Sequence, residues 1–171
     1  MNRHTAKLID RLLESSDSKF SLKALEKLFN LGIPFNLPHK FEFLEISSSK
    51  TLLKLPYIKK NQNHLGGLHA CALATLGEYP AGLSLIKQFG SAKYRLIMRK
   101  LEADYFKQAR GAVYGEVTYD PQVMAELTEN LKAQDQAEVT LSTHIINQSQ
   151  EVIAVIKTDW QVKNWEKVSF K

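Results

Sequence analysis

An almost unbroken stretch of apolar and small residues runs from Gly67 to Lys87, and a single acidic side chain, Glu78, interrupts it. A helix without a polar face has to be surrounded by the rest of the fold, so this stretch predicts a buried central helix over residues 67–87. A carboxylate inside such a helix is costly unless it has a partner or a chemical role. Glu78 is therefore the residue that most needs an explanation.

The start of this helix carries a second polar group, His69, nine residues before Glu78. Nine residues turn a helix by about 900° and advance it by roughly 13 Å, so the two side chains lie on opposite faces. One small reacting group cannot touch both within a single copy of the chain. Two antiparallel copies about a two-fold axis bring Glu78 of one copy to the Gly66–His69 turn of the other. The spacing predicts half of a site shared between subunits.

The length of 171 residues suits one domain with an ordinary core. No apolar run approaches the roughly 20 residues that cross a bilayer, and the N-terminal segment has no secretory apolar region. The lone cysteine, Cys71, cannot form an internal disulfide and fits a reducing compartment. We therefore expect a cytoplasmic protein with no membrane partner.

The net charge of +5 is compatible with nucleic-acid binding. However, the basic residues are spread among acidic ones, and no RNA-binding signature accompanies them. We expect no nucleic-acid partner and interpret the basicity as a solvated surface with a modest attraction for a phosphorylated small molecule. The candidate contacts flank the helix start or lie on and beside the strands after the helix: Lys59, Lys60, Arg95, Arg99, Lys107 and Arg110.

Leucines at helical spacing predict two N-terminal helices, over residues 3–15 and 21–32, with Ser21 as the N-cap of the second. Two prolines favour an extended segment over 33–38. Alternating hydrophobicity then predicts strands over 41–46 and 51–57.

Within the buried helix, Pro80 should introduce a bend, and Gly90 stands where a C-terminal cap belongs. The second half of the chain predicts four further strands, and the first of them has mixed faces that indicate a bulge. These strands span 94–106, 112–119, 139–147 and 152–163, with a short polar helix over 121–133 and a hairpin turn over 147–150.

A long apolar helix between two early strands and four later ones resembles the hotdog fold, in which a curved antiparallel sheet wraps around one central helix. Acyl-CoA thioesterases of the phenylacetic-acid-degradation (PaaI) type carry an Asn, a Gly three residues on, a His three further on, and an acid nine after that. The same spacings stand here as Asn63, Gly66, His69 and Glu78. The segment from Tyr105 to Gly111 is also similar to the turn between that family's third and fourth strands.

This resemblance covers residues 41–160. It implies an α+β hotdog domain over 33–171, on which an N-terminal helical extension, 1–32, packs. The more particular likeness is to uncharacterised thioesterase-like hotdog proteins with such an extension and a Glu in place of Asp.

The resemblance implies hydrolysis of an acyl-CoA-like thioester at the interface of a homodimer or a dimer of dimers. Glu78, Asn63 and His69 would be the catalytic residues, with Glu78 as general base or nucleophile. Substrate would bind at Gly66, Gly67, the amides of Leu68 to Ala70, and a basic rim of Lys59, Lys60, Arg99 and Arg110. We expect no metal, and no cofactor besides the CoA thioester that serves as substrate.

Two departures from the family pattern keep another reading open. The usual His-Gly-Gly is His69-Ala70-Cys71 here, and no Ser or Thr stands between Tyr94 and Phe106 to hold a water molecule. Both departures favour a non-catalytic module that binds or senses acyl thioesters, whereas the retained Glu78 favours an enzyme. A scaffold whose N-terminal helices recruit a partner is a third alternative.

The single residues have structural alternatives too. Glu78 could pair with Arg95 or Arg99, His69 could cap the helix, and Asn63 could form a turn. We expect Cys71 to be a small core residue, because it points to a different helix face from His69.

Overall fold

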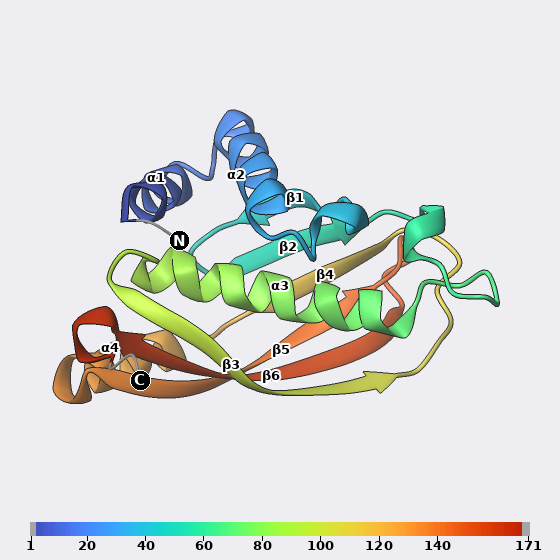
Figure 1. Cartoon of the computed structure of the whole chain (residues 1–171). Coiled ribbons are helices and arrows are strands. Elements are labelled where there is room, and N and C mark those ends of the chain that lie inside the picture. Colours follow the sequence, from blue (N-terminus) through green and yellow to red (C-terminus); the bar gives the residue numbers. More distant parts are fainter. Residues whose placement is uncertain (1–2, 169–171) are drawn as a thin grey trace.

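The computed structural model describes residues 3–168 and shows six antiparallel strands that curve around one central helix, α3 (Figure 1). The strand order is β1-β2-β4-β5-β6-β3, so β1 and β3 form the two edges of the sheet. The strands are β1 (Glu42–Ile46), β2 (Lys50–Leu55), β3 (Tyr94–Tyr105), β4 (Val113–Thr118), β5 (Gln136–Ile146) and β6 (Val152–Asn164). The helices are α1 (Arg3–Glu14), α2 (Lys19–Gly32), α3 (Ala70–Phe89) and α4 (Pro121–Gln134), with short 3-10 turns η1 (Leu37–His39), η2 (Lys59–Asn61) and η3 (Trp165–Lys167). This is the arrangement that the resemblance predicts.

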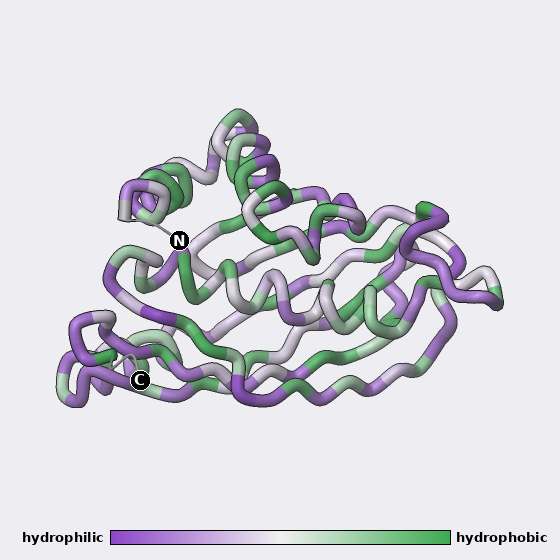
Figure 2. The backbone as a smooth tube through the Cα atoms, in the orientation of Figure 1, coloured by the Kyte–Doolittle hydropathy of each residue, from purple (hydrophilic) through white to green (hydrophobic). Residues whose placement is uncertain are grey.

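The long helix packs closely on the sheet because small residues stand where the two surfaces meet. A Cβ added to Gly77 would lie 2.3 Å from the Cβ of Ile156, and one added to Gly115 would lie 2.7 Å from the carbonyl oxygen of Leu76. Leu76 and Leu83 are almost completely buried between helix and sheet, and burial of each such side chain stabilises the fold by roughly 1.5–3 kcal/mol. Alternating apolar and polar positions along the strands are visible in Figure 2.

The N-terminal helices lie on the β1 side of the molecule and are joined to it by specific hydrogen bonds. The Asp10 carboxylate accepts hydrogen bonds from the backbone amides of Ser91 and Ala92, in the turn that follows α3. The carboxylate of Glu26 accepts from the amide of Phe43 at 2.9 Å, and Asn30 donates to the carbonyl of Phe41 at 3.1 Å. Side chains of α2 therefore form hydrogen bonds with backbone groups at and beside the outer edge of β1. Another strand would otherwise be able to pair with these groups.

Most of the predicted elements are present at nearly the predicted bounds. The bulge in the 94–106 strand lies between Met98 and Lys100, and Gly90 caps α3 with a φ of 78°. Pro80 lies inside α3 and does not end it. The outermost residues of the two predicted regions, 1–2 and 169–171, lie outside the described part of the chain.

Three local expectations were wrong. The N-cap of α2 is Ser18, whose side chain accepts from the amide of Phe20, whereas Ser21 is buried inside the helix. Residues 33–38 do not form an extended segment: only Ile33 has an extended backbone, 34–36 form a turn, and 37–38 belong to η1, because a proline is tolerated in the first turn of a helix. The central helix begins at Ala70 instead of Gly67, since the amides of Leu68 and His69 bond to other segments of the chain.

Candidate active site at the start of α3

The loop before α3 is ordered by the side chain of Asn63. Its Oδ1 accepts hydrogen bonds from the amides of Leu65 (2.9 Å) and Gly67 (3.1 Å), and its Nδ2 donates to the carbonyl of Leu68 (3.4 Å). This is the turn-forming behaviour typical of asparagine. Both ends of the amide are engaged by the backbone, so Asn63 acts on the site by holding the loop.

The two glycines of this loop have different surroundings. Gly66 has a φ of +75°, a conformation that favours glycine, and apart from its two chain neighbours no described residue has an atom within 4 Å of where its Cβ would stand. Its carbonyl accepts a hydrogen bond from the Tyr57 hydroxyl. Gly67 is covered by the side chain of Gln108, since an added Cβ would lie 2.6 Å from the Gln108 Cγ. Gly66 therefore offers open space for a ligand, whereas a ligand reaches Gly67 only if Gln108 moves.

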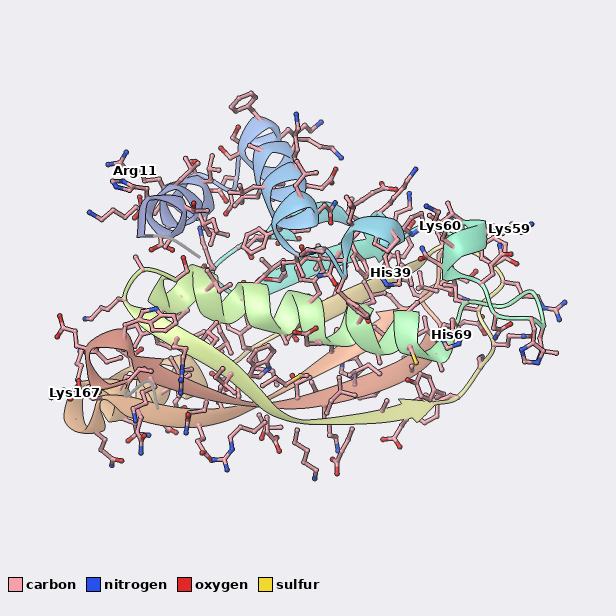
Figure 3. The ribbon with its side chains drawn as sticks, viewed as in Figure 1. Arg11, His39, Lys59, Lys60, His69 and Lys167 are labelled. Carbon is pink, nitrogen blue, oxygen red and sulfur yellow. The ribbon has the colours of Figure 1, made fainter. Side chains whose placement is uncertain are left out.

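His69 is the N-cap of α3. Its Nδ1 accepts a hydrogen bond from the amide of Cys71 at 3.1 Å, so the neutral ring carries its proton on Nε2. The imidazole is exposed at the start of the helix (Figure 3). The capping interpretation of His69 is thus confirmed, and the Nε2 side of the ring remains available to a ligand.

One backbone amide at the helix start is free. Leu68 donates to the carbonyl of Ala109, His69 donates to the carbonyl of Asn61, and Cys71 donates to His69. Within residues 3–168, the amide of Ala70 has no acceptor. It occupies the first helical position, where the helix dipole favours negative charge. The amides of Leu68, His69 and Ala70 were all predicted to polarise a substrate carbonyl. Because the first two already have acceptors, the prediction now applies to the Ala70 amide alone.

Asn61 holds this arrangement together, and the sequence did not single it out. Its fully buried side chain donates to the carbonyls of His39 (3.0 Å) and Pro56 (2.9 Å), and its Oδ1 lies 2.9 Å from Nδ1 of His39. Its backbone carbonyl accepts from His69. Figure 3 shows His39 and His69 at the same end of the molecule. The contacts with His39 span 22 residues of sequence, so no local pattern could indicate them.

Glu78 lies in the third turn of α3 and is half-buried. Burial raises the pKa of its carboxyl group above the ordinary value of 4.5. No hydrogen-bond donor or cation of residues 3–168 contacts this carboxylate, and Arg99 pairs with Glu138 instead. The structure therefore does not contain the proposed pairing of Glu78 with Arg95 or Arg99.

Cys71 lies seven residues before Glu78, which places both on the same side of α3. The thiol of Cys71 is exposed, so the expectation of a core cysteine was wrong. Ala74, between them on that side, is also only partly buried. This side of α3 is the part of the helix that the fold of one copy leaves incompletely covered.

The basic candidates divide into two groups. Lys59 and Lys60 are exposed on η2 at the same end as His69 (Figure 3). Arg110 donates to the Gln108 side chain at 3.1 Å and lines a shallow pocket of about 250 Å³ beside the loop. Arg99 pairs with Glu138, which alternates with the inward-facing residues of β5 and so lies on the sheet face turned away from α3.

The structure thus separates Arg99 from the other rim residues, and Lys107 is paired with Glu151 at 2.7 Å. Among the described residues, no group of three or more His, Cys, Asp or Glu side chains could hold a metal ion. None of the described helices has the length and hydropathy needed to cross a membrane.

A family model described as a domain of unknown function, DUF4442, matches residues 22–162. The chain belongs to the DUF4442 family. A comparison with curated proteins finds no match for this DUF4442 protein.

Solved structures identify its fold. A protein of unknown function from Pseudomonas aeruginosa, described as a probable thioesterase, is 23% identical with a TM-score of 0.75 over 83% of this chain and 95% of that one. A mutant of a Staphylococcus aureus thioesterase is 15% identical with a TM-score of 0.62, covering 76% and 98% of the two chains. A Streptococcus mutans protein bound to acetyl-CoA is 15% identical with a TM-score of 0.55, covering 72% and 89%. The DUF4442 protein therefore has the hotdog fold of thioesterase-like proteins.

Proposed function

We propose that this DUF4442 protein hydrolyses acyl-CoA-like thioesters at a site formed between two copies of the chain. The observation that carries the proposal is the half-buried carboxylate of Glu78, which no cation or donor among residues 3–168 neutralises. Such a group with a raised pKa is a candidate general base. A structural carboxylate would be expected to have a partner.

The incomplete site of one copy supports sharing between two. Glu78 and the free amide of Ala70 are eight residues apart on one helix, so about 12 Å of helix axis separates them. A second copy in antiparallel orientation brings its own helix start to the first copy's Glu78. Assembly about a two-fold axis is the commonest arrangement of identical subunits.

The sheet has one edge at which a second copy can pair. In the described structure β3 pairs only with β6, so its outer edge presents backbone groups to a further strand, and its side chains Ile97 and Met98 are exposed. The opposite edge, β1, is occupied by Glu26 and Asn30 of α2. Pairing of two β3 strands would extend the sheet and place two copies of α3 side by side, since α3 packs next to β3.

The chemistry follows from this arrangement. The thioester carbonyl oxygen accepts a hydrogen bond from the amide of Ala70, which stabilises the negative charge that develops on it. Glu78 of the partner takes a proton from water as the water oxygen bonds to the carbonyl carbon. The carbon–sulfur bond then breaks, and the thiolate receives the proton from Glu78. In the alternative that uses the same geometry, the Glu78 carboxylate bonds to the carbonyl carbon and the carbon–sulfur bond breaks to release the thiolate. Water then hydrolyses the mixed anhydride to the free acid and the Glu78 carboxylate, and the proton lost from water neutralises the thiolate.

The remaining residues have supporting roles in the proposal. Asn63 holds the loop, His69 caps the helix and offers Nε2 to the substrate or the water, and Gly66 leaves space for the thioester. Lys59, Lys60 and Arg110 attract the phosphates of CoA. The Streptococcus mutans hotdog protein with acetyl-CoA supports this class of ligand.

Release of free thiol from acyl-CoA substrates tests the proposal directly. Purified protein is supplied with a short, an aromatic and a long acyl-CoA, and Glu78→Gln serves as the inactive control. We expect turnover of at least one substrate and its loss in the variant. Binding of the acyl-CoA without turnover in the wild-type protein would instead identify the non-catalytic binding module, which the missing Ser or Thr on β3 favours.

A further inference from the structure

The outward face of α2 carries exposed apolar and basic side chains together. Phe20, Lys23, Lys27 and Leu31 follow one another at intervals of three or four residues and therefore share one stripe of the helix. Phe20 is 80% exposed and Leu31 is 61% exposed. The opposite face, with Leu22, Leu25 and Phe29, is buried against the domain. The fold thus leaves two large apolar side chains in solvent between lysines.

The neighbouring helix repeats the pattern. Lys7, Leu8 and Arg11 are all exposed on α1, with Arg11 one turn after Lys7 and Leu8, and Leu8 is 50% exposed. Figure 3 shows Arg11 on α1, directed away from the sheet. Phe35, in the turn after α2, is 66% exposed. We call the exposed residues of α1, α2, the turn between them and the turn after α2 the N-terminal face.

The N-terminal face has more cations than acids, and the carboxylates of two of those acids are bonded to the domain. Asp10 bonds to the turn after α3, and Glu26 bonds to the amide of Phe43 and to Lys23. The acids that remain exposed are Glu14 and Asp17. The exposed cations are Lys7, Arg11, Lys19, Lys23 and Lys27, of which Lys23 is paired with Glu26 at 2.9 Å.

We propose that the N-terminal face docks on the surface of an anionic phospholipid bilayer. Exposed aromatic and aliphatic side chains enter the boundary between headgroups and acyl chains, and the surrounding Lys and Arg side chains are attracted to anionic lipids. The buried faces of α1 and α2 stay bound to the domain, so docking needs no unfolding. The sequence-based expectation of no membrane partner rested on the absence of a spanning segment, which surface attachment does not require.

The position of this face agrees with the rest of the fold. Helix α2, which carries Phe20 and Leu31, lies over the β1 side of the sheet, and β3 forms the opposite edge (Figure 1). Two copies paired through β3 would therefore leave the outward face of α2 exposed. The proposal goes beyond thioester hydrolysis and does not depend on it.

Vesicle flotation tests the proposal with the full chain. One vesicle preparation contains phosphatidylcholine alone, and the other contains phosphatidylcholine mixed with phosphatidylglycerol. We expect flotation with the anionic vesicles and little with the neutral ones, and we expect added salt to weaken the binding. The double variant Phe20→Glu/Lys27→Glu should bind the anionic vesicles about tenfold more weakly or worse.

The matched control is Val123→Glu/Lys157→Glu. It removes one exposed apolar side chain and reverses one exposed lysine on other surfaces, α4 and β6. It should bind like the wild-type protein, and circular dichroism should show that both variants are folded. Absence of binding to anionic vesicles, equal binding to neutral ones, or an equal loss in the control would overturn the proposal.

Light scattering tests whether the N-terminal face is instead a contact between copies of the chain. If Phe20→Glu/Lys27→Glu lowers the molar mass seen by light scattering, the face joins copies of the chain and the lipid proposal is wrong. Turnover of a short acyl-CoA without vesicles should be the same in this variant and in the wild-type protein. Loss of vesicle binding is thereby distinguished from any failure of the thioesterase proposal.

Discussion

The Tyr105 hydroxyl donates a hydrogen bond to the carbonyl oxygen of Ala70, 3.0 Å away. Tyr105 is the last residue of β3, the strand with the free edge, and Ala70 is the first residue of α3. The strand that we propose as the subunit contact therefore also holds the helix start that carries the free amide. The Tyr105–Ala70 contact therefore links the proposed subunit interface to the proposed catalytic amide. The following variants test these two roles separately.

Ala70→Pro removes the one free amide at the helix start. Proline is well tolerated at the first helical position, and His69 already has the extended backbone that a residue before proline adopts (ψ 137°). We expect turnover to fall by about 10²- to 10³-fold with little change in melting temperature. Ala70→Ser keeps the amide and should remain active. Undiminished turnover in folded Ala70→Pro would remove this amide from the mechanism.

Glu78→Gln keeps the shape of the side chain but cannot act as a base or nucleophile. We expect turnover to fall by about 10²-fold or more while substrate still binds and melting temperature does not fall. The stability should survive because the Glu78 carboxylate has no partner among the described residues to lose. Glu126→Gln, an exposed change on α4, is the control and should leave turnover and melting temperature unchanged. A less stable Glu78→Gln protein with normal turnover would contradict the assignment.

The pH dependence of turnover should report the raised pKa of Glu78. The base must be ionised, so the rate should fall as the pH drops through a pKa above 4.5. The folding stability should depend on pH in the opposite direction. A carboxyl group whose folded-state pKa is raised stabilises the protein below its unfolded pKa, and this contribution is lost as the pH rises through the folded pKa. Thermal melts of wild type and Glu78→Gln should therefore favour the variant at neutral pH and converge in acid.

Mixing two inactive variants tests the shared site. In a dimer of one Glu78→Gln chain and one Ala70→Pro chain, one site contains both changes and the other contains none. Random re-assortment should therefore restore about one quarter of the wild-type activity. A site contained within a single chain predicts no recovery after mixing, provided that light scattering shows that the two variants have exchanged subunits.

The basic rim should affect affinity more than turnover. We expect Lys59→Gln, Lys60→Gln and Arg110→Gln each to raise the KM for acyl-CoA, and the effect should shrink at high salt because exposed charges are screened. Arg99→Gln is the control, since Arg99 pairs with Glu138 on the other face of the sheet. A pantetheine thioester, which lacks the nucleotide, should bind all these proteins with similar affinity. Equal effects of Arg99→Gln would contradict this location of the rim.

Much of the fold is present in local sequence patterns. Local patterns predicted the four helices and six strands of the described residues, the central helix from its continuous apolar run, and the mixed faces of 94–106 predicted the bulge at Met98–Lys100. The Gly90 cap was equally local. Such features depend on interactions between residues a few positions apart, so they can be predicted from the sequence alone.

The sequence by itself determined that a buried helix would carry one carboxylate and that a glycine-rich loop would precede it. Only the tertiary structure decided which of the amides at the helix start stays free. The Leu68 amide donates to the carbonyl of Ala109, and the His69 amide donates to the carbonyl of Asn61. The tertiary structure also placed Arg99 away from the site and left Cys71 exposed. The partners in these contacts come from other strands and turns, and their identity is settled only when the sheet closes around α3.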